Sequence, residues 1–378
     1  MNISCYFMNK RILQVVCLFI PVLSMAQNQT ATVNQAGLTN SLQLSQQGGA
    51  HRVNWEQSGT LNTSVIDQQS GANQAAHSAT LRMGGHNNES NQIEVKQAGA
   101  GNEVDIRLAG NKNTVDVVQQ SHTNQALVDL NGDIRVNRNE VTIQQTGAGN
   151  QLSLEVIGGN DNTLRLRQSG NQNRVGEAGS STRGLQVAGS DNRFILSQSG
   201  NGNTLFSAQV VGFDNRALLT QSGSDNGLRT SQTGLSHRAE VVQSGNSNTA
   251  TIRQQGLSSE AYIDQAGSGA QATVRQTDAN NYVDSKQTGS AARLDLEQTG
   301  GNRNRYAGTQ SGSDNQLDLD QNGTNNDLTI SQTGVGGRIM GAGQIGNGNQ
   351  LNVNVSANNV SLQVNQTGSG NTGSFRQQ

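Results

Sequence analysis

The sequence predicts an all-β fold: a flat, two-sheet parallel β-solenoid of about 15 stacked two-strand coils, cross-β and amyloid-like, with no capping elements. Three observations lead to this prediction. A unit of about eleven residues repeats along most of the chain. Polar and aliphatic residues alternate with a period of two inside each unit. The one proline of the chain, Pro21, precedes all of the repeats.

The repeating unit is N-x-φ-x-φ-x-Q-[S/T/A]-G-x-x, in which φ is an aliphatic residue. The stretch NQLDLDQNGTNNDLTISQTG, residues 315–334, contains two consecutive units. Asn315, Leu317, Leu319 and Gln321 stand two residues apart and therefore share one face of a strand. The Gly-rich and Asn-rich residues that follow form a turn. Each unit is thus expected to be one strand and one turn.

A single unit cannot bury its two aliphatic side chains against anything, so we expect the units to stack. Stacking places aliphatic side chains over one another and lets the inward Asn and Gln amides bond to the equivalent amides of the next coil. A buried amide without such partners costs about 1–3 kcal/mol. The predicted structural amide ladder comprises Asn40, Gln46, Gln57, Asn162, Gln168, Asn192, Gln198, Asn203, Gln209, Asn226, Gln232, Asn315, Gln321, Asn326, Gln332, Gln366 and Gln377.

Glycines follow the ladder glutamines at the start of each turn, where a positive φ is expected. The predicted turn glycines are Gly170, Gly200, Gly223, Gly234, Gly245, Gly323, Gly334 and Gly368.

Short turns favour two units per coil, or about 22 residues, over a triangular coil of three units. In the less regular first half of the chain, the Gln position falls near Gln69 and Gln120. The pattern loosens at residues 70–96, 130–145 and 174–187, which we interpret as bulged or lengthened turns inside one continuous domain.

Residues 1–26 have the three parts of a secretory signal peptide: Lys10 and Arg11, an apolar run over 12–23, and small residues at Ser24 and Ala26. We expect cleavage after Ala26, which leaves residues 27–378 as a single repeat solenoid. Both cysteines lie within the signal, so the mature chain has no disulfides.

Composition argues against several functions. Without Lys10 and Arg11 the chain has 23 basic and 27 acidic residues, and no basic stripe that would bind nucleic acid. No later segment is apolar enough for membrane insertion. The outward charges, such as Asp318 with Asp320 and Arg165 with Arg167, are scattered, unlike a catalytic cluster. We expect no enzyme activity, no catalytic residues, no cofactor and no metal site.

Two patterns suggest metal ligands but fit poorly. Asp129, Asn131, Asp133 and Glu140 have the spacing of an EF-hand loop, yet Ile134 stands where that loop needs glycine. Whether this 129–140 loop binds calcium stays open. Three of the five histidines occupy ladder positions, which favours a structural role.

The paired repeats after a signal peptide resemble curlin, the subunit of bacterial curli fibres. His51, His77 and His237 replace Asn in the pattern, and Leu108, Val156 and Val355 replace Gln. The resemblance implies a secreted structural subunit of a functional amyloid fibre on the bacterial cell surface, with roles in extracellular matrix, biofilm and adhesion. It also implies an outer-membrane secretion channel and a nucleator subunit as partners.

The repeats extend close to both ends of the chain, so we expect a homopolymer that grows head to tail through residues around 31–57 and 349–377. The alternatives are a non-polymerising β-solenoid adhesin or ligand-binding module and, less favoured, a β-helix enzyme that cleaves polysaccharides. The sequence leaves open whether the chain is the major subunit or a nucleator, what it adheres to, and which machinery secretes it.

Overall fold

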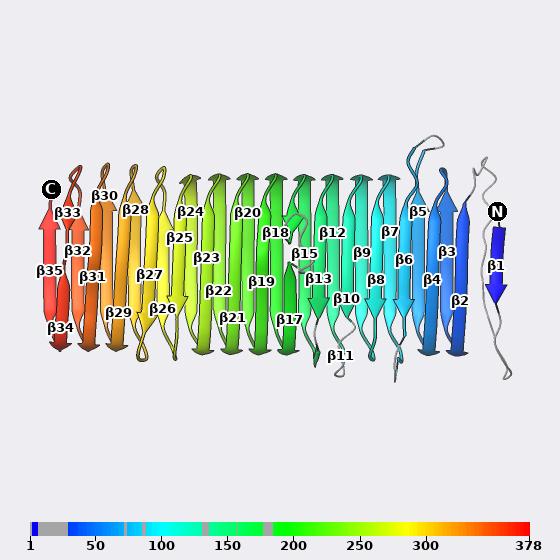
Figure 1. Cartoon of the computed structure of the whole chain (residues 1–378), viewed down its shortest axis with the longest axis horizontal. Coiled ribbons are helices and arrows are strands. Elements are labelled where there is room, and N and C mark those ends of the chain that lie inside the picture. The colour runs from blue at the N-terminus through cyan, green and yellow to red at the C-terminus, as the bar shows by residue number, and fades with distance from the viewer. Residues whose placement is uncertain are drawn as a thin grey trace. The chain divides into compact units, whose positions relative to one another are not determined.

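The computed structural model describes residues 2–6, 29–71, 74–84, 88–130, 136–156, 158–176 and 184–378. The chain divides into two compact units, residues 1–194 and 195–378, and each unit is described by itself. Each is a parallel β-solenoid in which successive strands alternate between two sheets (Figure 1). The expected signal peptide lies largely outside the described residues.

Unit 1 contains sheets A1 and B1 and the short pair β11 (Val136–Asn137) and β14 (Gly159–Asn160). Sheet A1 comprises β1 (Asn2–Tyr6), β2 (Thr30–Leu38), β4 (Arg52–Thr60), β6 (Ser78–Met83), β8 (Glu103–Leu108), β10 (Gln125–Leu130), β13 (Gln151–Val156), β16 (Arg174–Val175) and β17 (Leu185–Ser190). Sheet B1 comprises β3 (Ser41–Gln47), β5 (Thr63–Gln69), β7 (Gln92–Ala100), β9 (Thr114–His122), β12 (Glu140–Ala148) and β15 (Thr163–Asn171).

The strand β18 (Arg193–Asn201) includes the boundary between the units. In unit 2, sheet A2 comprises β19 (Thr204–Phe213), β21 (Gly227–Leu235), β23 (Thr249–Leu257), β25 (Gln271–Gln276), β27 (Arg293–Thr299), β29 (Gln316–Thr324), β31 (Arg338–Asn347), β33 (Ser361–Leu362) and β34 (Asn365–Ser369). Sheet B2 comprises β20 (Arg216–Ser224), β22 (Arg238–Asn246), β24 (Glu260–Ser268), β26 (Tyr282–Gln287), β28 (Arg305–Ser311), β30 (Asp327–Thr333), β32 (Gln350–Val355) and β35 (Thr372–Gln377).

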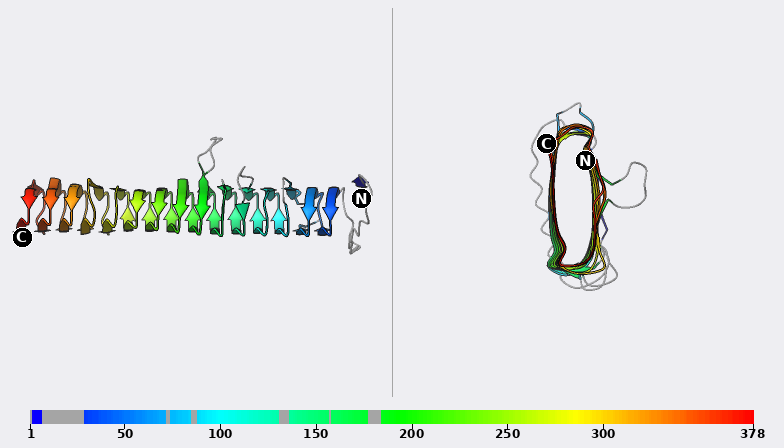
Figure 2. Two further views of the ribbon diagram at one scale, coloured as in Figure 1. Left: turned by 90° about the horizontal axis from the view of Figure 1, so that it is seen from below. Right: turned by 90° about the vertical axis from the view of Figure 1, so that its left-hand side faces the viewer.

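Within each unit the strands pair in parallel with the equivalent strands of neighbouring coils. In sheet B2, Ala217 pairs with Ala239 and Ala239 with Ala261, so each coil contains 22 residues there. Seen end-on, a coil is a narrow loop with two long sides (Figure 2). The prediction of two units per coil and about 15 coils is therefore confirmed, and the triangular coil is excluded.

The longer repeats of unit 1 keep the same pairing. Thr63 pairs with Gln92, and Glu140 pairs with Thr114, although 29 and 26 residues separate these partners. The extra residues lie between strands, as the loosened pattern indicates. Parts of those segments, residues 72–73, 85–87, 131–135 and 177–183, lie outside the described residues.

The core is the space between the two sheets, and along most strands every second side chain is buried in it. Large and small residues complement each other across it. Trp55 is fully buried, and its indole nitrogen donates to the Ser64 hydroxyl of the other sheet at 3.0 Å. The Tyr306 side chain fills the space left by Gly308, since a Cβ there would overlap its hydroxyl group. Burial raises the pKa of Tyr306.

Many turns contain two residues with positive φ, which lets the chain reverse within a few residues. All eight predicted turn glycines have φ between 96° and 134°. A second left-handed residue directly precedes the ladder Asn, as Asp225 (φ 56°) precedes Asn226. This second position tolerates Asp, Ser and Asn. No helix occurs in the described residues, and hence none there could cross a bilayer.

Replacing Gly223 by Ala should destabilise unit 2 more than replacing Gly269 by Ala. Both glycines have positive φ, 101° and 68°, which costs Ala about 1–2 kcal/mol. Only at Gly223 would the added Cβ also overlap a carbonyl oxygen of the next coil, that of Gly245, whereas Gly269 has open space. Urea unfolding midpoints of the two variants measure the difference. Equal losses would show that coil spacing does not constrain this turn.

Candidate assembly site: the buried amide ladders

Two glutamine ladders run through unit 2, one at the end of each sheet's inward row. In sheet A2 the Gln321 side-chain nitrogen donates to the Gln344 side-chain oxygen at 2.8 Å, and Gln321 accepts from Gln298 at 2.7 Å. The second N–H of Gln321 donates to the backbone carbonyl of Arg305 in the opposite sheet at 2.9 Å. This ladder comprises Gln232, Gln254, Gln276, Gln298, Gln321, Gln344 and Gln366.

The equivalent ladder of sheet B2 includes Gln221, Gln243, Gln265, Gln287, Gln310 and Gln332, and Gln198 donates to Gln221 at 2.8 Å. Apart from Gln332, whose side-chain nitrogen makes no hydrogen bond, the glutamines from Gln221 to Gln310 bond both along the stack and across to the other sheet. One side chain fixes the register of its strand and the spacing of the two sheets.

The described residues of unit 1 form one such glutamine ladder. Sheet B1 carries it, through Gln46, Gln68, Gln97, Gln119, Gln145 and Gln168, with N···O distances of 2.7–2.9 Å. In sheet A1 an apolar row replaces it. That row is fully buried and comprises Met83, Leu108, Leu130, Val156 and Val187. The departures at Leu108 and Val156 thus belong to a continuous, self-consistent replacement.

Asparagine ladders begin the strands of both sheets. The Asn40 side-chain nitrogen donates to the carbonyls of Ala36 at 3.0 Å and Gly59 at 2.9 Å. Its side-chain oxygen accepts the backbone N–H of Asn62 at 3.0 Å. The same three contacts recur at Asn226, and Asn162 and Asn326 repeat the contacts with the next coil. The Asn side chain therefore closes the preceding turn and anchors the next coil.

The two kinds of ladder point in opposite directions along the stack. Each Gln donates to the glutamine that follows it in the sequence, as Gln46 does to Gln68. Each Asn accepts from the asparagine that follows it, as Asn40 does from Asn62.

Most of the predicted ladder residues lie in these rows, but Gln209 does not. A β-bulge between Leu205 and Ser207 shifts β19 by one residue, so Gln209 is exposed and Val210 occupies the ladder position beside Gln232. The prediction for Gln209 is wrong because an inserted residue exchanges the two faces of a strand. The side-chain oxygen of Gln232 is consequently buried without a partner.

Smaller differences occur where a ladder meets an apolar residue. Gln57 is buried and has no side-chain partner, although Gln35 precedes it in register; Met83, which follows it, offers no acceptor for its N–H groups. The Gln332 side-chain nitrogen lacks a partner because Val355 follows it in register. Gln377 pairs in register with Val355 at the end of sheet B2 and is exposed. In β5 and β9 the ladder uses Gln68 and Gln119, one residue before the positions that the sequence indicates.

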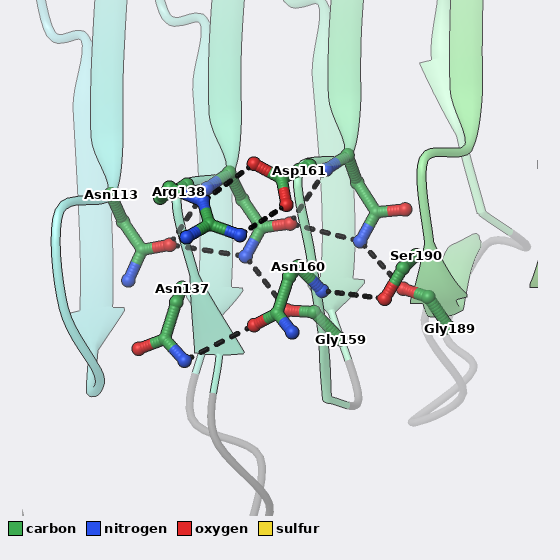
Figure 3. A network of polar contacts seen from close by, with 10 residues as sticks. Asn113, Asn137, Arg138, Gly159, Asn160, Asp161, Gly189 and Ser190 are labelled. Atoms are coloured by element: carbon green, nitrogen blue, oxygen red, sulfur yellow. Dashed lines mark hydrogen bonds and ion pairs between the residues drawn. The ribbon is translucent and has the colours of Figure 1, made fainter.

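Sequence reasoning missed an outer set of asparagines at the turns, which Figure 3 shows in unit 1. The Asn137 side chain donates to the Asn160 side-chain oxygen at 3.1 Å, beside the buried Asn ladder. Next to it, Arg138 and Asp161 form a bidentate ion pair, in which Nε and Nη2 of Arg138 donate to the two carboxylate oxygens at 2.7 and 2.6 Å. The Arg138 guanidinium holds the pKa of Asp161 below its usual value. Recurring Asn directly after the turn glycine, as in Gly159-Asn160, Gly170-Asn171 and Gly245-Asn246, would have indicated this set.

The outward faces of the described strands carry isolated ion pairs. Arg165 contacts Glu140 at 3.3 Å, Arg275 contacts Glu297 at 3.4 Å, and Lys96 contacts Glu94. Exposed pairs of this kind contribute little to stability. A shallow hollow of about 160 Å³ lies over β5, β7 and β9, beside Asp67, Lys96 and Gln120.

No group of three or more His, Cys, Asp or Glu side chains within the described residues could hold a metal ion. Residues 131–135 of the candidate calcium loop lie outside that part of the chain. The described part therefore offers stacked amides and no cluster of chemically reactive groups.

The family comparison agrees with this geometry. The curlin associated repeat family matches residues 159–200, 223–256 and 245–277. These segments of the chain are therefore curlin repeats. No curated protein matches it. The curlin repeat family is structural, and the matched segments include ladder residues such as Gln168, Gln232, Gln243 and Gln254.

Replacing Gln321 by Leu should cost about 1–3 kcal/mol, because Gln298 loses its acceptor and Gln344 its donor inside the core. Gln209→Leu is the matched control, since Gln209 is exposed in the same sheet. Hydrogen exchange of the β27 and β31 backbone amides reads out the effect. If these amides are equally protected from exchange in the Gln321→Leu and Gln209→Leu variants, the ladder does not fix the register.

Proposed function

We propose that the curlin-repeat protein is a secreted structural subunit that polymerises head to tail into curli-like amyloid fibres on the bacterial cell surface. The observation that carries this proposal is the chemistry of the two sheet edges. The edge strands β3 and β35 each have Asn at the start and Gln at the end of the inward row, as an internal coil does, with Gly373 and Phe375 at the two middle positions of β35. An edge strand with unpaired N–H and C=O groups is a template for a further strand.

The edge of unit 2 is formed by β34 and β35. Among the described residues β35 pairs only with β32. Asn371, directly before β35, and Phe375 and Gln377 within it lie at inward positions, and the Asn371 side-chain oxygen accepts no N–H among the described residues. In sheet A2, one side-chain N–H of Gln366 donates to the backbone carbonyl of Gln350, which leaves the second N–H for a strand added at the edge.

The edge of unit 1 is complementary. In β3, Asn40, Leu42, Leu44 and Gln46 face inward, and Gln46 offers a side-chain oxygen toward the edge. If β35 of one copy pairs with β3 of another, Asn371 meets Asn40 and Gln377 meets Gln46. The same sequence offset also brings Gln366 to Gln35 on β2.

Ladder polarity makes this junction directional. The glutamines at the unit 2 edge offer N–H donors, and those at the unit 1 edge offer oxygen acceptors, so a head-to-head junction would oppose like groups. Such a heterologous contact does not close on itself and builds a filament.

Part of the expected signal peptide covers the same sheet edge. β1, at residues 2–6, pairs with β2 from Asn2↔Thr30 to Tyr6↔Asn34. We infer that removal of residues 1–26 during secretion frees the β2 edge for a second copy. An outer-membrane secretion channel, a nucleator subunit, and roles in biofilm and adhesion are part of the proposal, by analogy with curli fibres.

Purified residues 27–378 should assemble into β-rich fibres that bind amyloid dyes and diffract with a meridional spacing of about 4.7–4.8 Å. Sedimentation, dye fluorescence and fibre diffraction provide the measurements. A chain that remains monomeric for weeks at high concentration, and that binds glycans saturably, would instead identify a ligand-binding solenoid.

Replacing Ser374 by Pro should slow elongation strongly without unfolding unit 2. The carbonyls of Asn371 and Gln377 accept N–H groups at positions 350 and 356, so alternation turns the N–H of Ser374 to the opposite edge. Proline removes that donor, whereas Ser374→Ala, the control, keeps it. Seeded elongation rates provide the comparison. Equal elongation by both variants would contradict growth through β35.

A further inference from the structure

Three buried histidines take the place of asparagine in the Asn ladders. His51 and His77 occupy successive coils of unit 1, are both fully buried, and stack with ring centroids 4.9 Å apart and 6° between the planes. The Nε2 atom of His51 lies 2.9 Å from the carbonyl oxygen of Gln47, and that of His77 lies 3.0 Å from the carbonyl oxygen of Gln69. Because a carbonyl only accepts, each Nε2 carries a proton.

The other ring nitrogen is an acceptor. The backbone N–H of His77 donates to Nδ1 of His51 at 3.1 Å, and that of Asn102 donates to Nδ1 of His77 at 3.1 Å. Nε2–H thus replaces the Asn side-chain nitrogen, and Nδ1 replaces its oxygen. Asn40 makes the same two contacts with Ala36 and Asn62.

His237 repeats the arrangement in unit 2. Its Nε2 lies 3.2 Å from the carbonyl oxygen of Thr233, and its Nδ1 accepts the backbone N–H of Ser259 at 3.2 Å. Its own backbone N–H donates to the Asn215 side chain at 3.0 Å. The same geometry in both units fixes one neutral tautomer at all three positions.

A proton on Nδ1 would turn this acceptor into a donor that faces another donor. We propose that His51, His77 and His237 make the curlin-type solenoid sensitive to acid: neutral imidazoles bind the next coil, and protonated imidazoles release it. An asparagine at the same position has no such state. In the stacked pair, protonation of both rings would also place two positive charges against each other.

The direction of the pKa shifts agrees with the geometry. Burial lowers the pKa of all three histidines from the ordinary value, and hydrogen bonds to backbone groups oppose it only in part. The unfolded chain therefore binds these protons more readily than the folded chain. The contribution of these ladder positions is complete above about pH 6.5 and is lost as the pH falls below it.

Surrounding charges do not offset this effect. The charge that acts on His77 is that of His51, which lowers its pKa further, and no charged group is a cause of the shifts at His51 and His237. Around the stacked pair the charged side chains are Arg52 and Glu56 on β4, Asp67 on β5, Arg82 on β6, Glu94 and Lys96 on β7, and Glu103, Asp105 and Arg107 on β8. Around His237 they are Asp214, Arg216 on β20, Arg229 on β21, Arg238 and Glu240 on β22, Arg253 on β23, and Glu260 and Asp264 on β24.

This inference does not depend on polymerisation, since the hydrogen bonds concerned lie within one chain. The test compares the full chain with the double variant His51→Asn/His77→Asn. Between about pH 7.5 and 5.0, hydrogen-exchange protection of the amides at positions 77 and 102 should fall several-fold in the original chain and stay constant in the variant. In unit 2, His237→Asn should have the same effect on the amide of Ser259.

His122→Asn is the control, because His122 is exposed at the end of β9 and should leave the pH dependence unchanged. The proposal is overturned if protection in the original chain does not respond to acid, or if the ladder variants keep its full pH dependence. It is also overturned if the double variant already loses protection at pH 7.5, which would mean that ring stacking rather than the ladder contact holds these coils. Nitrogen-15 NMR that places the neutral proton on Nδ1 would contradict the tautomer.

Discussion

Hydrogen bonding between identical amides in successive coils is the interaction on which the rest of this structure depends. Aliphatic side chains supply most of the buried surface, but a Leu or Val packs almost equally well against several neighbours. An inward Gln or Asn has full hydrogen bonding in one register only. A shift by one residue would turn these amides outward and bury charges in their place, as the exposed position of Gln209 after a single bulge illustrates. The ladders thus make a repetitive sequence adopt one alignment.

The two units use this device to different extents. Unit 2 has Gln ladders in both sheets, whereas sheet A1 of unit 1 substitutes the apolar row from Met83 to Val187. That row is tolerated because apolar residues stack on apolar residues. Hydrogen bonds are lost where a ladder glutamine lies next to this apolar row, as at Gln57, whose amide is buried without a partner. Unit 1 also accommodates longer turns between its coils, and the single ladder through Gln97, Gln119 and Gln145 keeps sheet B1 in register across them.

The amide ladders that stabilise a coil would also form hydrogen bonds with a second copy of the chain at the sheet edge. A sheet edge with unpaired backbone groups is ordinarily restrained by charge, proline or a covering element. In the strands β3 and β35 the inward amides are arranged as they are in an internal coil. The histidines add a titratable form of this contact, which asparagine cannot provide. Structural order and the capacity for further pairing therefore arise from one set of residues.

The sequence by itself determined the strands, the inward faces and the two-strand coil, because period-two alternation and short Gly-rich turns are local properties. It also indicated the structural role of residues such as Asn226 and Gln321. Only the tertiary structure decided which of two adjacent residues enters a ladder position. Gln68 does so rather than Gln69, and Val210 rather than Gln209, and a bulge such as that in β19 is recognised only from the pairing with the neighbouring strand. Ladder polarity, the acceptor role of histidine Nδ1 and the outer asparagines at Asn137 and Asn160 likewise depend on contacts between residues some 22 or more positions apart.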